Sequence, residues 1–187
     1  TINVDGSGIG VKATLDGHER TVNTGASVNI RAASGGSAID VAGAKSVTNS
    51  GNLISRSTVA DGNVLNVHGA DTISNSGTIA SSSANIAAIA MSNIGNKTFT
   101  NTGSITGFVD FATGDNLINL AGGSLVGNVK ASGGTNTVMA SDGSLHVGDV
   151  ILTGSKAQTV TVKGGSTLGN LVMTGSGDRQ TEVKQLS

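Results

Sequence analysis

Hydrophobic residues return at a constant interval of about 26 residues over the first half of the chain, inside short segments in which apolar and polar residues alternate. Three columns of such positions run in the same register: Val47, Ile73 and Phe99; Leu53, Ile79 and Ile105; and Ile39, Leu65 and Met91. Alternation over about four to six residues is typical of a strand with one buried face. A period of 20–50 residues is typical of repeat architectures. The pattern therefore predicts three short strands per repeat, each placing its apolar residues at the same height in a stacked core.

Glycine and asparagine follow the same interval at the turns between these segments. The key glycines are Gly25, Gly51, Gly77 and Gly103, and an asparagine stands two residues before each: Asn23, Asn49, Asn75 and Asn101. Stacked identical amides can form hydrogen bonds from one repeat to the next, and glycine suits turns that need a positive φ. We therefore predict an asparagine ladder beside a glycine column, both running through four repeats.

The interval shortens in the second half of the chain, where the equivalent glycines follow more closely, at Gly123, Gly143 and Gly165. We interpret residues 1–187 as a single all-β domain, a right-handed parallel β-helix (solenoid) of about seven or eight coils. Wider coils of about 26 residues are expected over 1–106, and tighter coils of about 20–22 residues over 107–187. The alanine-rich segment 84–91 favours helix by propensity, but the unbroken interval favours a strand there.

Composition supports a thin core and limits the partners. The chain has 29 glycines, three phenylalanines, and no proline, cysteine, tryptophan or tyrosine. A core without large aromatics depends on small branched side chains. The formal net charge is −1, with charged residues scattered singly, so no basic face for nucleic acid is expected. Without cysteine, neither disulfides nor cysteine-metal sites are possible.

Candidate catalytic and metal-binding groups do not form columns. His18, His68 and His146 occupy different points of the repeat, and zinc needs three or four converging ligands, so we expect turn or surface histidines and no metal. Asp110 and Asp115 are the one carboxylate pair retained as candidates for glycoside hydrolysis, with the alternative that they are a turn acid and a strand-end acid. The serine motifs at 5–8 and 141–144 match ordinary Gly/Asp turns. We therefore expect no catalytic residues and no cofactor.

The motifs NTGASV, NSGNLI, NSGTIAS, NTGSITG and GGSLVGNV together resemble the passenger domains of bacterial autotransporters (type V secretion), over roughly residues 20–170. This resemblance implies a right-handed parallel β-helix that is exported through the outer membrane and displayed on the bacterial cell surface or outside the cell. The first residues, TINVDGSG, do not form an apolar leader, and no run is long enough for a membrane helix. We therefore expect the leader and the barrel anchor to lie outside this segment, which itself does not enter the membrane.

Three functions fit these features. The first is a non-catalytic adhesin segment that mediates cell–cell aggregation, biofilm formation or attachment to host surfaces. Its partners would be copies of itself on neighbouring cells or a ligand of the host surface or matrix. The second is a polysaccharide-acting enzyme, a hydrolase or lyase with a groove along the helix. The third is a passive stalk spacer. Sugar-binding enzymes commonly use aromatic platforms, which this chain lacks, so the adhesin is preferred; its binding residues are unknown from sequence.

Overall fold

The structure, a computed structural model, describes residues 2–4, 11–14, 21–25, 29–32, 37–58, 63–92 and 95–184. This part of the chain contains 23 strands and no helix. The strands are sorted into three sheets in which every neighbouring pair is parallel. Sheet A contains β1 (Ile2–Val4), β4 (Asn29–Ala32), β7 (Asn52–Ser55), β10 (Thr78–Ala80), β13 (Ser104–Thr106), β16 (Ser124–Val126) and β19 (Leu145–Val147). Sheet B contains β2 (Val11–Thr14), β5 (Ile39–Ala42), β8 (Leu65–His68), β11 (Ala87–Met91), β14 (Phe108–Thr113), β17 (Val129–Ser132), β20 (Val150–Thr153) and β22 (Leu171–Thr174). Sheet C contains β3 (Thr21–Thr24), β6 (Ser46–Asn49), β9 (Thr72–Asn75), β12 (Lys97–Asn101), β15 (Asn116–Ala121), β18 (Asn136–Ser141), β21 (Gln158–Lys163) and β23 (Arg179–Lys184).

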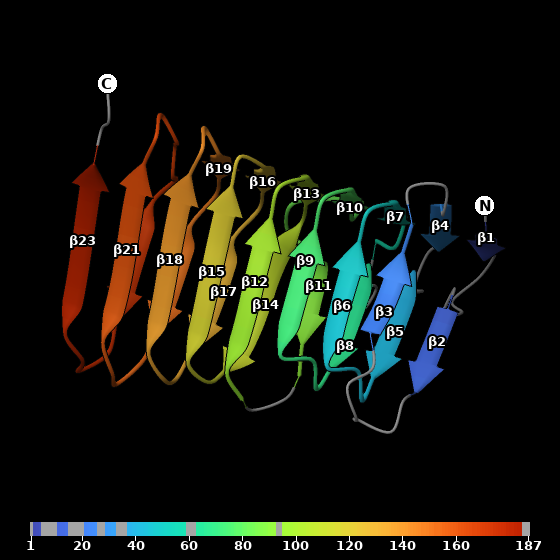
Figure 1. Ribbon diagram of the computed structural model, residues 1–187, viewed down its shortest axis with the longest axis horizontal. Coiled ribbons are helices and arrows are strands. Elements are labelled where there is room, and N and C mark those ends of the chain that lie inside the picture. Colours follow the sequence, from blue (N-terminus) through green and yellow to red (C-terminus); the bar gives the residue numbers. More distant parts are fainter. Residues whose placement is uncertain are drawn as a thin grey trace.

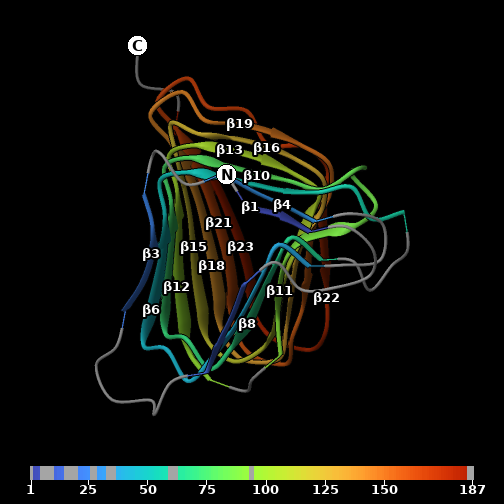
Figure 2. The ribbon, with the colours of Figure 1, turned by 90° about the vertical axis from the view of Figure 1, so that its right-hand side faces the viewer.

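From β1 to β21 the chain visits the sheets in the fixed order A, B, C, so each of these coils adds one strand to each sheet and the coils stack into a rod (Figure 1). The last coil adds β22 and β23 to sheets B and C and reaches sheet A only through a single bridge between Thr167 and Leu145. Seen from the N-terminal end, the path from sheet A to sheet B to sheet C runs clockwise while it recedes from the viewer (Figure 2). The coil is therefore right-handed, as is usual for connections between parallel strands. The predicted all-β solenoid with three strands per coil is the architecture of the protein.

Two of the predicted apolar columns stack as expected. Ile73 pairs with Val47 on one side and Phe99 on the other, and Ile79 lies between Leu53 and Ile105 in the same way. All of these side chains are buried. The column of Ile39 and Leu65 also forms, but its predicted third member is wrong, because Ile89 pairs with Leu65 and Met91 pairs with Val67. The step from Leu65 to Ile89 is shorter than the step from Ile39 to Leu65, so the constant interval does not hold at this point of sheet B.

The first coil is out of the predicted register by one residue. Thr24, not Asn23, pairs with Asn49, and Val22 pairs with Val47. A slip of one residue exchanges the two faces of a strand, and keeping Val22 in the core turns Asn23 outward, where it is exposed. Gly25 is displaced with it and has no neighbouring atom where its Cβ would be. Asn23 and Gly25 therefore do not belong to the ladder and the glycine column.

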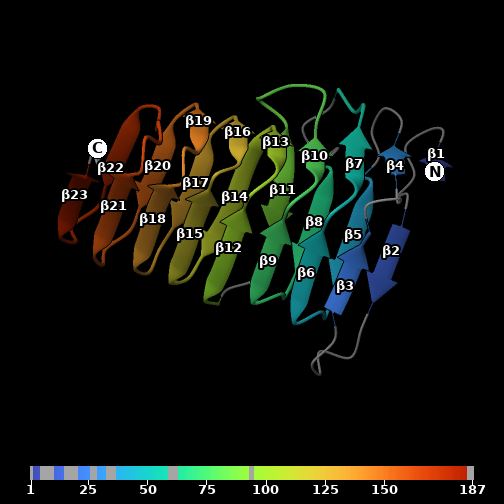
Figure 3. The ribbon, with the colours of Figure 1, turned by 45° about the horizontal axis from the view of Figure 1, so that its top comes forward.

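In the wide coil that contains β10 and β11, a longer connection lies at the corner between sheets A and B (Figures 2 and 3). Residues 81–86 connect β10 to β11, whereas Gly107 alone connects β13 to β14. The step from Ile79 to its partner Ile105 is accordingly longer than the step from Ile105 to its partner Leu125. The coil length thus changes near residue 106, while the coils on both sides of the change keep their three strands.

The core consists of stacked, mostly aliphatic residues from all three sheets, and its aromatic rings lie where the coil length changes. Phe99 and Phe111 are completely buried and pack edge to face, with ring centroids 5.4 Å apart. Such pairs contribute about 0.5–1.5 kcal/mol beyond their buried area. The third ring, Phe108, lies 4.2 Å from the Nζ of Lys130 in the next coil. These contacts join the wide coils to the narrow ones.

Candidate functional site

The outer face of sheet C is the most regular polar surface in the described part of the chain. Because alternate residues of each strand point outward, the stacked strands present two parallel columns of half-buried or exposed side chains. One column is Ser46, Thr72, Thr98, Leu117, Thr137 and Thr159, and the other is Thr48, Ser74, Thr100, Asn119, Met139 and Thr161. Hydroxyl groups therefore repeat at the strand spacing of about 4.7–4.9 Å.

A buried amide ladder supports one edge of this face. Asn49 Nδ2 donates to Asn75 Oδ1 over 2.7 Å, and Asn75 Nδ2 donates to Asn101 Oδ1 over 2.8 Å. Thr24 Oγ1 donates to Asn49 Oδ1 and takes the place predicted for Asn23. The ladder ends at Asn101, whose amide donates to the Ser124 carbonyl oxygen over 3.1 Å. Leu120 follows in the next coil.

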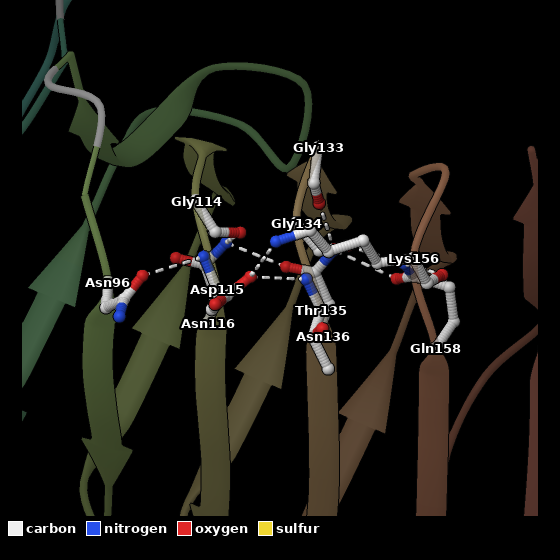
Figure 4. Close-up of polar contacts among 10 residues, drawn as sticks. All are labelled: Asn96, Gly114, Asp115, Asn116, Gly133, Gly134, Thr135, Asn136, Lys156 and Gln158. Atoms are coloured by element: carbon white, nitrogen blue, oxygen red, sulfur yellow. Dashed lines mark hydrogen bonds and ion pairs between the residues drawn. The ribbon is translucent and has the colours of Figure 1, made fainter. Parts of the chain in front are cut away.

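A second amide ladder lies at the start of the later sheet C strands, and the sequence-based reasoning missed it (Figure 4). Asn116 Nδ2 donates to Asn136 Oδ1 over 2.7 Å, and Asn136 Nδ2 donates to Gln158 Oε1 over 2.9 Å. All three side chains are buried. Their spacings of 20 and 22 residues match the shortened interval, which was the available signal, but the change from asparagine to glutamine hides the column.

Gly51, Gly77 and Gly103 stack as predicted along the corner where sheet C passes to sheet A. A Cβ on Gly77 would lie 2.1 Å from the carbonyl oxygen of Gly51, and one on Gly103 would lie 2.1 Å from that of Gly77. Only glycine permits this approach of successive backbones. Gly77 and Gly103 line a shallow groove of about 450 Å³, together with residues that carry hydroxyl groups, such as Thr78 and Ser104.

A larger groove of about 1000 Å³ lies along the opposite edge of sheet C, where the two coil types meet. We call it the junction groove. It crosses four successive sheet C strands, β9, β12, β15 and β18. Its lining comprises Asp71, Thr72, Gly95, Asn96, Lys97, Thr98, Asp115, Asn116, Leu117, Thr135 and Thr137. It combines carboxylates, an ammonium group, amides, hydroxyls and one apolar side chain.

Lys97 and Asn116 border the junction groove in register on neighbouring strands, with their side chains on the buried face of sheet C. Lys97 is 4% exposed, and its Nζ donates to the carbonyl oxygens of Gly95, over 2.9 Å, and Thr113, over 3.5 Å. Burial lowers the pKa of Lys97, and the carboxylate of Asp71 opposes that shift. Asn116 is 3% exposed, and its buried Oδ1 has no hydrogen-bond partner. The buried face therefore has one hydrogen-bond donor too few at this point.

The two candidate carboxylates have separate local tasks. Asp110 Oδ1 accepts a hydrogen bond of 3.0 Å from the backbone N–H of Ala112, which has a φ of 52°. Asp115 Oδ1 accepts one of 2.7 Å from the N–H of Thr135 in the next coil (Figure 4) and lies 3.8 Å from Lys156 Nζ. Asp115 is therefore an acid at the start of a strand, in line with the alternative, whereas Asp110 lies inside β14 beside an irregularity of the strand pairing. Asp115, but not Asp110, lines the junction groove.

The three histidines have different environments. His18 lies outside the described residues. His68 is on the surface, with its Nε2 3.2 Å from Asp40 Oδ1 and its Nδ1 against Ser92 Oγ.

His146 is 2% exposed, so the expectation of a turn or surface residue is wrong for it. It occupies the core column below Leu125. Its Nε2–H donates to the Gly127 carbonyl over 2.9 Å, and its Nδ1 accepts from the Gly169 N–H over 3.4 Å. Burial lowers the pKa of His146, opposed by the hydrogen bond to Gly127 and by the charge of Asp149. The neutral ring is stable in the core because both of its nitrogens are hydrogen-bonded.

The serine motif at 141–144 is a turn in which Ser141 Oγ donates to Asp142 Oδ2 over 2.9 Å, and Ser144 is buried. The motif at 5–8 lies outside the described residues. Among the residues that the structure describes, no three histidine, cysteine, aspartate or glutamate side chains converge as metal ligands, and none of the elements is a helix that could cross a membrane. No protein-family model, curated protein or solved structure matches this chain.

Proposed function

We propose that this chain is a surface-exposed segment of a bacterial autotransporter adhesin, that it acts without catalysis, and that it promotes aggregation between cells, biofilm formation or attachment to surfaces. The observation that carries the proposal is the outer face of sheet C, where hydroxyl groups repeat in two columns over successive coils. Each hydrogen bond from such a face contributes only about 0.5–1.5 kcal/mol. A repeated array on many copies multiplies weak contacts into a firm one.

The charge and the rigidity of the face favour this function. With a formal net charge of −1, two rods lying side by side would not repel one another strongly. The amide ladders behind the face hold the strands in one register, which reduces the ordering cost of a lateral contact. The resemblance to autotransporter passengers supplies the proposed location, outside the outer membrane.

The test is to display the parent protein on a non-adherent bacterium and to measure settling, biofilm formation and attachment with and without residues 1–187. A double variant, Ser74→Lys with Thr100→Lys, adds two positive charges to the sheet C face and should abolish the lateral contact. Thr153→Lys with Thr174→Lys adds the same charge to exposed positions on sheet B and should leave it intact. If deletion changes none of the three measurements while the protein still reaches the surface, the segment is a passive spacer.

A further inference from the structure

The junction groove has the dimensions of a ligand site. It crosses four strands, which at about 4.8 Å per step gives a length of roughly 14 Å, and its volume of about 1000 Å³ is at the upper end of common ligand sites. A short oligomer with ring-sized units fits such a groove better than a single small ion does.

The charges of the groove are paired. The ammonium of Lys97 is almost fully buried, hydrogen-bonds to backbone carbonyl oxygens and interacts electrostatically with Asp71. Asp71 is exposed, and Asp115, just before β15, is half-buried with the exposed Lys156 Nζ 3.8 Å from its Oδ1. The carboxylates accept hydrogen bonds from hydroxyl groups, and neither sign of charge dominates the groove. The groove therefore favours an uncharged ligand that is rich in hydroxyls.

An apolar platform lies between the polar groups. Leu117 is 40% exposed and interrupts the column of threonines, with Thr98 on one side and Thr137 on the other. A pyranose ring has the matching pattern, because its C–H face is apolar and its rim carries hydroxyl groups. Apolar contact with a few placed polar groups is the usual composition of a ligand site.

We propose that the junction groove binds a neutral oligosaccharide, with a pyranose ring over Leu117 and ring hydroxyls on Asp71 and Asp115. This inference rests on the proposed adhesin function and gives it a ligand class. The proposal is for binding without cleavage, as in the proposed adhesin function.

The experiment measures retardation of the purified chain in native gels that contain a soluble β-glucan, a galactomannan, a dextran, heparin or hyaluronan. At least one of the three neutral polysaccharides should retard the chain, and the two anionic ones should not. Leu117→Thr continues the threonine column, so the fold should tolerate it. The substitution should raise the Kd about tenfold or more, because the contact between the leucine side chain and the sugar is lost. Asp71→Asn should weaken binding as well. Val147→Thr, at a side chain 51% exposed on sheet A, is the matched control and should bind normally.

The proposal is overturned if no neutral polysaccharide retards the chain, if heparin binds more tightly than the neutral ones, or if Leu117→Thr and Val147→Thr bind equally. Cells that display the segment separate this result from the adhesin proposal. If attachment still depends on residues 1–187 while no glycan binds, only the groove proposal fails. If deletion of the segment leaves attachment unchanged, the adhesin proposal fails whatever the groove binds.

Discussion

The amide of Asn49 donates a hydrogen bond of 2.7 Å to the side-chain oxygen of Asn75, which lies one full coil and 26 residues further along the chain. The bond is buried, so its partners have no access to water as a substitute. Each ladder member thus ties its own coil to the next.

Replacing Asn75 by alanine should therefore reduce the free energy of unfolding by about 1–3 kcal/mol, because buried groups of Asn49 and Asn101 lose their partner. Urea denaturation followed by circular dichroism measures this. Asn23→Ala is the control, since Asn23 is exposed, and it should leave the midpoint unchanged. Equal midpoints for the two variants would show that the ladder does not contribute.

Ile79 tests the apolar columns. It is completely buried between Leu53 and Ile105, and Ile79→Ala should cost about 2–5 kcal/mol. Ile79→Asp would bury an unpaired charge and should unfold at least the neighbouring coils. Ile54→Asp, on the adjoining outward-facing position of β7, should be far milder. If Ile79→Asp melts at the same temperature as the wild type, Ile79 does not belong to a buried column.

The glycine column predicts a sharp contrast between two similar substitutions. Gly103→Ala would place a methyl group 2.1 Å from the carbonyl oxygen of Gly77, so the coils must separate locally and stability should fall by more than about 1 kcal/mol. Gly25→Ala meets no atom within 4 Å and should be neutral or slightly stabilising. Thermal denaturation of both variants provides the comparison, and a stable Gly103→Ala would argue against tight coil stacking at this corner.

His146 predicts a dependence of stability on pH. Its folded-state pKa is lowered by burial, so the neutral ring stabilises the fold fully at pH values above the ordinary histidine pKa of about 6.5. As the pH falls below that value, the unfolded chain binds the proton first, and stability declines until the lowered folded-state pKa is reached. Urea midpoints between pH 7.5 and pH 5 should fall for the wild type. They should fall less for His146→Leu, which extends the column of Leu125. Identical slopes in the two proteins would remove His146 as the cause.

The proposed lack of catalysis is tested with the two aspartates. Because an asparagine oxygen can still accept the turn hydrogen bonds of Asp110 and Asp115, Asp110→Asn and Asp115→Asn should keep the stability of the wild type. Neither variant nor the wild type should release reducing sugars or unsaturated products from a panel of polysaccharides. Release by the wild type that either substitution abolishes would establish an enzyme.

Much of the fold could be predicted because the same pattern of apolar residues occurs in several successive repeats. Leu53, Ile79 and Ile105 are separated by one constant interval, and a single interval is enough to place three strands. The prediction was wrong where the interval changes by one or two residues. At Val22 the side chain that must be buried outweighs the asparagine–glycine pattern, and at Met91 a shorter step shifts the strand by one pleat.

The candidate site was harder to predict because a groove is lined by side chains from several coils, and their juxtaposition depends on the register between those coils. Leu117 is conspicuous only once Thr98 and Thr137 are known to flank it. The second ladder mixes Asn136 with Gln158, and a polar residue such as His146 gives no sign from its neighbours that it occupies a core column. Sequence shows which residues share an interval, but burial depends on the register that the packed coils select.

The strands lie across the long axis of the rod (Figure 1), so the hydrogen bonds between coils run along it. A pulling force applied to the two ends acts directly on these bonds, one pair of coils at a time, rather than shearing many in parallel. A released coil of about 20 residues extends to roughly 70 Å, in place of a single step of about 4.8 Å. Under load the rod should therefore lengthen in discrete steps, one coil at a time.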